Sequence, residues 1–316
     1  MIDLTSWFQQ HDHFLLVTHE KPDGDALGSV MGLYHCLTAI GKDAQVVLPE
    51  GYNHTFGYIP GIKMAVREPK EVYETVIALD CGDYLRINTP LGTRQVNLNI
   101  DHHITNSNFG LLNVVMPEMA ATAEILAVAL PNWGIPITAD AAICLYSAIL
   151  SDTLGFRTTN TTSHTLRVAA DLADLGAGIN DLYRKALLTT SMESLNYWKT
   201  GLGKLVREDN LAWSVITLQE WKDSGYSGKD DAELANLIGF IDGVDIAVLL
   251  RELPDGLVKV SWRSVASIDI SGLAGQFGGG GHANAAGAEI QKPLIDVQSE
   301  VLEATRLLLA KVRKSQ

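Results

Sequence analysis

Residues 13–25 have the sequence HFLLVTHEKPDGD, in which a short apolar run leads through a turn into the start of a helix. The apolar run has the length and composition of a buried strand. Pro22 and Gly24 suit the turn, and apolar residues recur at helical spacing from residue 25 to residue 40. A strand that is followed directly by a helix predicts the α/β class, with a parallel sheet and helices against it.

The same alternation of strand and helix continues through the first half of the chain. We expect further strands at residues 44–48, 75–79 and 95–100, and helices at 120–130, 140–150 and 163–175. With the first strand and helix, these segments predict an N-terminal domain built on a mostly parallel sheet with flanking helices.

The pattern changes near residues 186–193, where a polar helical stretch leads into strand-like segments. These lie at 211–218, 245–252 and 257–263, with a helix at 231–241. We therefore predict a smaller C-terminal α/β domain with a mixed sheet. The predicted boundaries are 1–187 for the first domain, 188–196 for a linker and 197–316 for the second domain, with an active-site cleft between the two domains.

The length and composition are those of a globular protein of two domains. The chain has 316 residues, of which 47% are hydrophobic, so each half can bury a core. The sequence shows neither a secretory signal nor an apolar run of the ~18–20 residues that span a bilayer, so we expect no membrane contact. Cys36, Cys81 and Cys144 lack the spacing of a disulfide or zinc motif, which indicates buried thiols in a reducing cytoplasm.

The negative net charge of the chain argues against long nucleic acids as substrates. Asp and Glu number 37 against 24 Lys and Arg, which gives a net charge of −13. Proteins that bind long nucleic acids usually present a basic stripe, because the neutralisation of phosphates supplies much of their affinity. If the substrate is a polyanion, we therefore expect a short one that is held by metal and a few local cations.

Residue types that bind metals follow three predicted strands and one predicted helix. In a parallel sheet, ligands bind beyond the carboxyl ends of the strands, so we expect these side chains to converge. Taken singly, an aspartate after a strand is more often a helix cap or a turn residue. Together, the carboxylates would repel one another strongly unless cations lay between them. The candidate residues are His19, Asp23, Asp25, Asp80, Asp101, His102, His103 and Asp152.

Two divalent cations are the simplest remedy for this repulsion. Imidazole combined with several carboxylates suits Mn²⁺ or Fe²⁺, and Mg²⁺ less well, while the lack of cysteine ligands argues against structural zinc. We therefore expect two divalent ions, with Mn²⁺ preferred and Mg²⁺, Co²⁺ or Fe²⁺ as alternatives.

The order of these motifs resembles that of the DHH phosphoesterase superfamily. The sequence has HxxDxD at 19–25, then Asp80, then DHH at 101–103, and then Asp152. The segment GGGGHANAAG at 278–287 resembles the signature of the DHH-associated domain. The paired motifs extend over most of the chain, which is most similar to the NrnA-like group of nano-RNases and pAp phosphatases.

The resemblance implies a role for each candidate residue. One ion would be held by His19, Asp23 and Asp80. The other would be held by Asp25, Asp80, His102 and Asp152, so that Asp80 bridges the two. Asp101 would orient a ligand imidazole, and His103 would face the phosphate as a hydrogen-bond donor or as the acid for the leaving group. Substrate contacts would come from Arg263, Gly279, Gly280, Gly281 and His282.

Two further segments have local interpretations. Four consecutive glycines allow backbone N–H groups to gather on an anion, and the small residues after His282 would allow a helix to begin close by. A flexible turn is the alternative. We expect Thr122 and Glu124 to cap the helix at 120–130, with a phosphate contact as the alternative. His164 has no motif context and is expected to be a surface or core residue.

These observations predict a metal-dependent phosphoesterase that uses an activated water to hydrolyse short nucleotides. The candidate substrates are oligoribonucleotides, 3′-phosphoadenosine 5′-phosphate, and linear or cyclic di-adenylate. An inorganic pyrophosphatase or polyphosphatase is one alternative, against which the segment at 278–287 argues, and a non-catalytic nucleotide-binding regulator is another. We expect a cytoplasmic protein that binds neither long nucleic acid nor a membrane, and a homodimer is left open.

Overall fold

The computed structural model describes residues 2–70, 72–87, 91, 94–228, 231–265 and 267–315. The chain divides into two compact units, Met1–Thr189 and Thr190–Gln316. Within the described ranges, we find no helix with the length and apolar character required to cross a bilayer. Each unit contains its own sheet and its own core, so the two are described separately.

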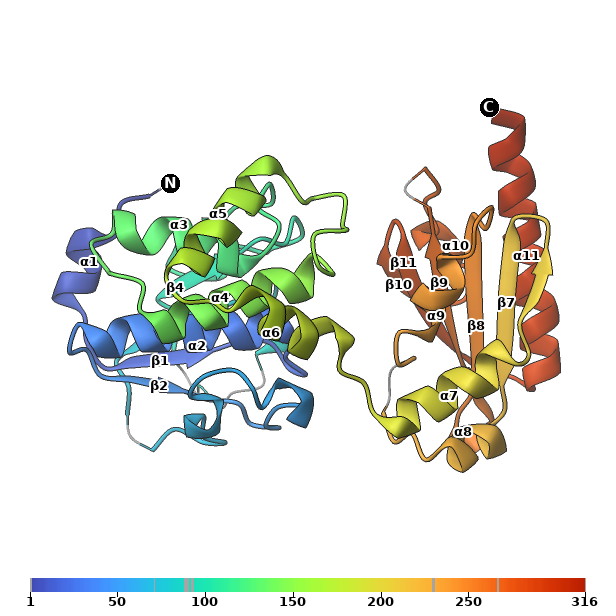
Figure 1. Ribbon diagram of the computed structural model, residues 1–316, viewed down its shortest axis with the longest axis horizontal. Helices are drawn as coiled ribbons and strands as arrows, with labels where there is room; N and C mark the ends of the chain where they lie inside the picture. The colour runs from blue at the N-terminus through green and yellow to red at the C-terminus, as the bar shows by residue number, and fades with distance from the viewer. Residues whose placement is uncertain are drawn as a thin grey trace. The chain divides into compact units, whose positions relative to one another are not determined.

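The first unit is built on a parallel sheet in the order β2-β1-β3-β4-β5. Figure 1 labels its strands β1, β2 and β4. Its strands are β1 (Phe14–Val17), β2 (Ala44–Val46), β3 (Thr75–Leu79), β4 (Leu98–Asp101) and β5 (Leu112–Val115). Its helices are α1 (Thr5–Gln10), α2 (Gly24–Ala39), α3 (Thr122–Asn132), α4 (Ala139–Asp152), α5 (Ser163–Asp174) and α6 (Ile179–Tyr183). Shorter helical turns are η1 (His54–Phe56), η2 (Ile62–Met64) and η3 (Tyr84–Arg86), and a π-helix, η4 (Arg184–Leu188), ends the unit.

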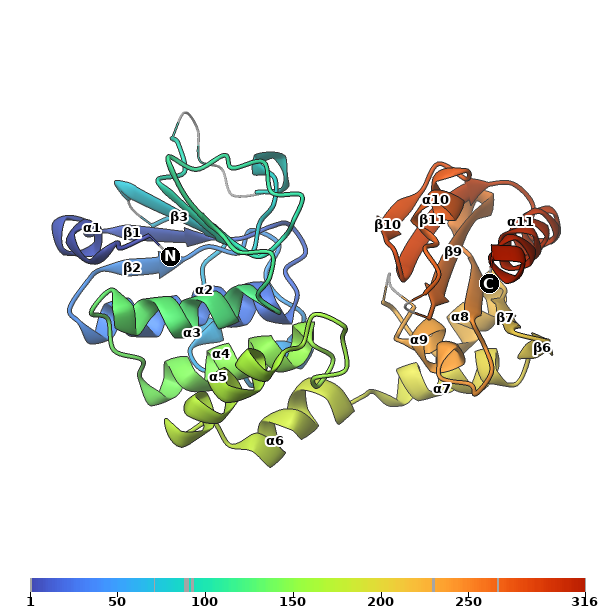
Figure 2. The same ribbon diagram turned by 90° about the horizontal axis from the view of Figure 1, so that it is seen from above.

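The predicted α/β fold with a parallel sheet is confirmed, although the strand β5 and the helices α1 and α6 were not predicted. Asp152 is the last residue of α4 and does not lie beyond it. Helices α2 to α5 lie on one face of the sheet, as Figure 2 shows. Alternate residues of β1 face opposite sides: Phe14 and Leu16 pack with these helices, whereas Leu15 and Val17 pack with connecting segments on the other face.

Helices α2 and α4 pack closely because a row of glycines in α2 faces α4. A methyl group at Gly28 would lie 2.5 Å from the Cys144 carbonyl oxygen, and one at Gly32 would lie 2.7 Å from the Leu145 side chain. At the start of α2, a methyl group at Gly24 would lie only 2.2 Å from Ser151 Oγ. This close approach brings the first turn of α2, which carries Asp25, next to the last turn of α4, which carries Asp152.

The second unit has a mixed sheet in the order β10-β11-β9-β8-β7-β6, in which the β7–β8 pair is parallel and the other strand pairs of the described residues are antiparallel. The strands are β6 (Val206–Glu208), β7 (Leu211–Ile216), β8 (Ile246–Glu252), β9 (Leu257–Ser264), β10 (Gly280–His282) and β11 (Ala285–Gln291). The helices are α7 (Met192–Leu202), α8 (Leu218–Ser224), α9 (Leu234–Gly239), α10 (Ser271–Gly275) and α11 (Leu294–Ser315), with a 3-10 turn, η5 (Pro254–Gly256).

Both faces of this sheet are covered. Leu211 and Trp213 of β7 join a cluster with α10 and α11, while Ala212 and Ile216 join a cluster with α7 and α9. The predicted mixed sheet is thus confirmed, although α11 and the strands β6, β10 and β11 were not predicted. Helix α7 begins inside the segment that the sequence predicted as a linker.

The helix expected after the glycine run was wrong, because this segment forms the hairpin β10–β11. The run brings two backbones into contact: a methyl group at Gly279 would lie 2.1 Å from the Gly287 carbonyl oxygen, and Gly281 has a φ of 143°. Four glycines in sequence are compatible with a helix start or with a tight hairpin, and the pairing with β11 decides in favour of the hairpin.

The hairpin predicts unequal effects of two neighbouring substitutions. Gly279→Ala should destabilise the protein by about 2 kcal/mol, because its methyl group would overlap the backbone of Gly287. Gly280→Ala is the matched control, since a methyl group there meets nothing within 4 Å. Urea unfolding followed by tryptophan fluorescence measures both. Equal free energies of unfolding for the two variants would contradict the tight packing of the glycine run.

Candidate metal centre

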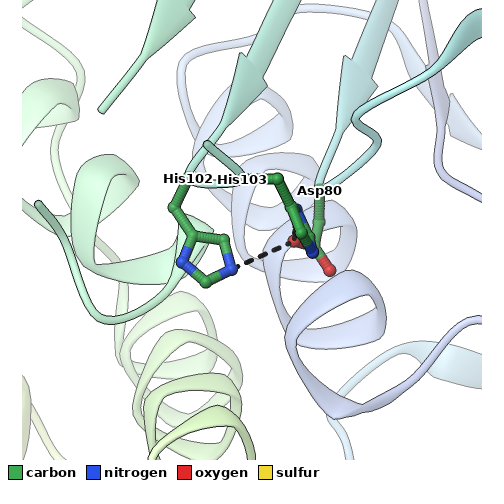
Figure 3. A group of neighbouring side chains, drawn as sticks. All are labelled: Asp80, His102 and His103. Atoms are coloured by element: carbon green, nitrogen blue, oxygen red, sulfur yellow. Dashed lines mark ion pairs between the residues drawn. The ribbon is translucent and has the colours of Figure 1, made fainter. Parts of the chain in front are cut away.

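The candidate ligands gather at the carboxyl edge of the first unit's sheet. His19 follows β1, Asp80 follows β3, and Asp101 ends β4. Asp80 has a left-handed φ of 52°, which an aspartate tolerates better than most residues and which turns its side chain at the strand end. His102 and His103 come directly after Asp101, and Figure 3 shows their imidazole rings beside the Asp80 carboxylate.

The structure brings the predicted ligands into three overlapping groups. His19, Asp23 and Asp80 offer donor atoms within 4.8 Å of one another, and so do Asp25, His102 and Asp152. A third group, Asp80 with His102 and His103, overlaps both. Imidazole nitrogens combined with carboxylate oxygens fit a divalent cation such as Mn²⁺, Fe²⁺ or Mg²⁺.

Asp80 belongs to the first group and also lies close to His102 of the second. Its Oδ2 is 3.8 Å from His19 Nε2, and its Oδ1 is 3.8 Å from His102 Nε2. His102 Nε2 is in turn 3.9 Å from Asp25 Oδ2 and 3.6 Å from Asp152 Oδ2. The two oxygens of one carboxylate therefore point toward different groups of donors, as a bridging ligand requires.

Backbone carbonyls orient the two imidazoles. His19 Nδ1 is 2.6 Å from the Glu20 carbonyl oxygen, and His102 Nδ1 is 3.2 Å from that of Met119. A carbonyl oxygen can only accept, so each contact favours a proton on Nδ1, and a neutral ring then has its lone pair on Nε2. The Nε2 atoms that face the carboxylates are therefore free to bind a cation. At His19 the Arg86 guanidinium lies 3.3 Å from the same Nδ1 and competes for it as a donor.

Backbone N–H groups orient two of the carboxylates. Asp25 accepts from the N–H groups of Thr122 and Ala123, at 2.7 and 3.1 Å, and from the Ser29 hydroxyl at 3.1 Å. One oxygen of Asp23 caps α2 by accepting from the N–H groups of Asp25 and Ala26. The other oxygen of Asp23 has the freedom to face an ion.

The electrostatics of this centre favour cations. Burial raises the pKa of Asp80 well above its usual range, and the charges of Asp25 and Asp23 raise it further. Burial also raises the pKa of Asp25, and burial together with the charge of Asp25 raises that of Asp152 to about 8. Without cations, these acids would therefore keep their protons to a higher pH than usual, and divalent ions in the same place would replace those protons.

Asp101 and His103 form a separate pair at the edge of this centre. His103 Nδ1 donates to Asp101 Oδ1 at 2.7 Å, and Asn106 Nδ2 donates to Asp101 Oδ2 at 2.6 Å. Burial raises the pKa of Asp101, but these bonds outweigh it and leave that pKa lowered, while the bond to Asp101 raises the pKa of His103. His103 is thus better suited to donate a proton than to bind a metal, although it lies 3.7 Å from Asp80.

Several contacts around this centre were not predicted from the sequence. Asn106 was overlooked, and Thr122 was expected to cap a helix or bind phosphate, whereas the Thr122 hydroxyl donates to Asp80 Oδ1 at 3.0 Å. Glu124, which is buried, accepts from the Ala120 N–H at 2.8 Å and from His164 Nδ1 at 2.7 Å. The contacts of Thr122 with Asp80 and of Glu124 with His164 join residues that are 42 and 40 positions apart, and no local pattern indicates them.

The predicted substrate residues all lie in the second unit. Ala285 of β11 pairs with Arg263 of β9 on one side and with His282 of β10 on the other. The Arg263 guanidinium donates to Asn236 Oδ1 and forms an ion pair with Asp231 at 3.6 Å. His282 is exposed at the end of the glycine run. Arg263 and His282 therefore occupy the same level of the sheet, two strands apart.

Comparison with known proteins relates the whole chain to one family. Residues 13–149 match the DHH family, N-terminal domain, and residues 209–313 match the DHHA1 domain. The chain is 34% identical over 298 residues to the "Bifunctional oligoribonuclease and PAP phosphatase NrnA" of Thermus thermophilus, covering 92% of this chain and 88% of the relative.

Two further relatives extend this likeness. The protein of the same name from Bacillus subtilis is 26% identical over 292 residues, 89% of this chain and 90% of its own length. A crystal structure described as an exopolyphosphatase-related protein from Bacteroides fragilis superposes with a TM-score of 0.86 at 27% identity, covering 98% of this chain and 94% of that one.

The raised pKa values predict a pH-dependent effect of metal on stability. Carboxyls whose pKa is raised by folding bind more protons in the folded state, so the metal-free protein should lose stability as the pH rises from about 5 to about 8. Cations that replace these protons should counteract the loss. The increase in Tm on adding saturating Mn²⁺ to EDTA-treated protein should therefore be smallest near pH 5 and largest near pH 8.

The variant Asp152→Asn supplies the control. It removes one titrating carboxyl at nearly constant size, so its metal-free Tm should fall less steeply over the same pH range. A Mn²⁺-induced increase in Tm that does not change with pH would show that the buried acids and the metal do not compete for the same place.

Proposed function

The chain belongs to the DHH family, and on that premise we propose that it is a metal-dependent phosphoesterase that hydrolyses short nucleotides. The observation that carries the proposal is the position of Asp80, whose two carboxylate oxygens point toward two separate groups of donors. Two relatives that match nearly the full chain are named for oligoribonuclease and PAP phosphatase activity, which supports both the reaction and the size of the substrate.

We further propose two divalent ions, with Mn²⁺ as the preferred metal. His19, Asp23 and Asp80 would hold one ion, and Asp25, Asp80, His102 and Asp152 would hold the other. Such a pair of ions supplies an activated water and neutralises the charge that develops on phosphoryl oxygens. The donor set of imidazoles and carboxylates, without cysteine, supports this choice of metal.

In the proposed mechanism, His103 acts on the substrate. Its Nδ1 donates to Asp101, which raises the pKa of the imidazole and fixes the orientation of the ring. Its side chain is 29% exposed, so a substrate can reach the remaining Nε2–H. His103 would donate this proton to a phosphate oxygen or to the leaving group, and Asp101 would act by orienting His103.

The second unit would supply the nucleotide contacts. Arg263 offers a guanidinium, which pairs well with a terminal phosphate, and Gly280, Gly281 and His282 offer backbone atoms and an imidazole on the neighbouring hairpin. Gly279 would contribute by its close packing, since its N–H already donates to the Ala274 carbonyl oxygen at 3.0 Å. The net charge of −13 supports short substrates, since a long polyanion would be repelled over most of the surface. As part of the same proposal, we place the protein in the cytoplasm, where its three free and buried cysteines would stay reduced.

A panel of substrates separates this proposal from its alternatives. Metal-free protein would be supplied with Mn²⁺ and incubated with a diribonucleotide, 3′-phosphoadenosine 5′-phosphate, linear di-adenylate, pyrophosphate and polyphosphate. We expect turnover of one or more of the nucleotides and little of the inorganic substrates. Turnover of polyphosphate alone would favour the activity named for the Bacteroides relative. Tight nucleotide binding without any product would favour a regulator.

The substitution Asp80→Ala tests the bridging role directly. We expect nucleotide hydrolysis to fall by ~100-fold or more, while the far-UV circular dichroism spectrum stays that of the folded protein. Asp140→Ala, which removes an exposed carboxylate from the first turn of α4, serves as the control and should keep full activity. Full turnover by Asp80→Ala in saturating Mn²⁺ would contradict the bridge.

The substitution Arg263→Ala tests the nucleotide contact. A charge-assisted bond to phosphate contributes ~1.5–3 kcal/mol, so KM for the nucleotide should rise about tenfold or more with a smaller change in kcat. Arg306→Ala removes an arginine of the same unit that pairs with Glu208, and its KM should not change. An unchanged KM in Arg263→Ala would remove this residue from the nucleotide site.

A further inference from the structure

One threonine contacts both halves of the metal centre. Thr122 is the first residue of α3 and is fully buried. Its hydroxyl donates to Asp80 Oδ1 at 3.0 Å, and its backbone N–H donates to Asp25 Oδ2 at 2.7 Å. Thr122 does not belong to the three groups of candidate metal ligands. It instead donates hydrogen bonds to two of those ligands.

The hydroxyl contact determines how the Asp80 carboxylate is turned. Oδ1, which receives this bond, is the oxygen that faces His102, whereas Oδ2 faces His19. Rotation of the carboxylate about its bond to Cβ would break the bond and would leave the buried hydroxyl without an acceptor, a loss of about 1–3 kcal/mol. The bond therefore keeps one oxygen directed toward each group of donors.

The residues around Thr122 keep it in place. The N-cap residue of α3, Ala121, provides no side-chain acceptor, so Asp25 accepts the N–H groups that begin this helix. The preceding backbone is bound by Glu124, which accepts from the Ala120 N–H at 2.8 Å and also binds His164. The first turn of α3 is thus hydrogen-bonded to α2 through Asp25 and to α5 through His164, and these bonds restrain its position.

We propose that Thr122 is a positioning residue that sets the bridging orientation of Asp80 and so allows two cations to bind together. This inference rests on the two-ion centre of the proposed function. A threonine that only filled space in the core would need no hydroxyl at this position. A substitution that removes the hydroxyl alone therefore distinguishes positioning from packing.

Calorimetric titration of the metal-free protein with Mn²⁺ tests the inference. Thr122→Val has nearly the same shape but no hydroxyl, and at least one of the two Mn²⁺ ions should bind ~10- to 100-fold more weakly to it. Thr122→Ser keeps the hydroxyl and should bind Mn²⁺ within about threefold of the unaltered protein. Thr305→Val is the matched control, because Thr305 is also fully buried but lies in α11 of the second unit, and its Mn²⁺ affinity should not change.

Activity provides a second readout. With limiting Mn²⁺, kcat of Thr122→Val should fall, and excess Mn²⁺ should restore much of it, while KM for the nucleotide stays the same. A hydroxyl that contacted the substrate would instead raise KM at every Mn²⁺ concentration, and that result would overturn the positioning role.

The outcomes separate the inference from the function on which it rests. If the unaltered protein binds two Mn²⁺ ions and Thr122→Val binds both equally well, the inference fails and the proposed function stands. If the unaltered protein binds no Mn²⁺, the proposed function itself fails. Should Thr122→Val not fold, Thr122→Ser and Thr122→Ala differ only by the hydroxyl oxygen, and equal Mn²⁺ affinities in that pair would overturn the inference.

Discussion

The metal centre of the first unit depends on how the repulsion among its buried aspartates is compensated. Asp25 and Asp80 are almost completely buried, and Asp152 shares the same imidazole neighbour, His102. Such acids are stable together only if each negative charge is compensated by hydrogen bonds, protons or cations. The surrounding elements supply the hydrogen bonds: the start of α3 donates to Asp25, and the Thr122 hydroxyl donates to Asp80. The remaining charge is what a pair of divalent ions would balance, and this links the stability of the first unit to its chemistry.

Much of this centre could be predicted from the sequence, because a general rule of parallel sheets applies to it. His19, Asp80 and Asp101 each end or follow an apolar strand, and the carboxyl ends of parallel strands meet at one edge. The contact between Thr122 and Asp80 could not be predicted, since it joins residues that are 42 positions apart and depends on how α3 packs against the sheet. The strand β5 was missed for a different reason: it is short and only partly buried, so its apolar pattern is weak.

The second unit shows where local patterns are ambiguous. A run of four glycines is compatible with an anion-binding turn, a helix start or a tight hairpin, and only the partner strand distinguishes these. In the structure, Gly279 packs against the backbone of β11, and the same strand places Ala285 between Arg263 and His282. Gly279 and Gly281 are thus required by packing whether or not a nucleotide binds to them, whereas a methyl group at Gly280 would meet nothing within 4 Å, so a role in packing and a role in binding are separable by experiment.

The glycine row between α2 and α4 bears on the size of the ion that the centre accepts. Asp25 stands at the start of one of these helices and Asp152 at the end of the other, and between them the glycines of α2 pack closely on α4, against the Cys144 carbonyl oxygen and the side chains of Leu145 and Ser151. Packed interiors resist expansion, so the gap between these two acids has little freedom to widen. A cation of larger radius would have to separate two whole helices, whereas a smaller one would have to draw them through a contact that is already closed. If Asp25 and Asp152 hold one ion, as proposed, the close packing of α2 against α4 would limit the ionic radius that fits between them.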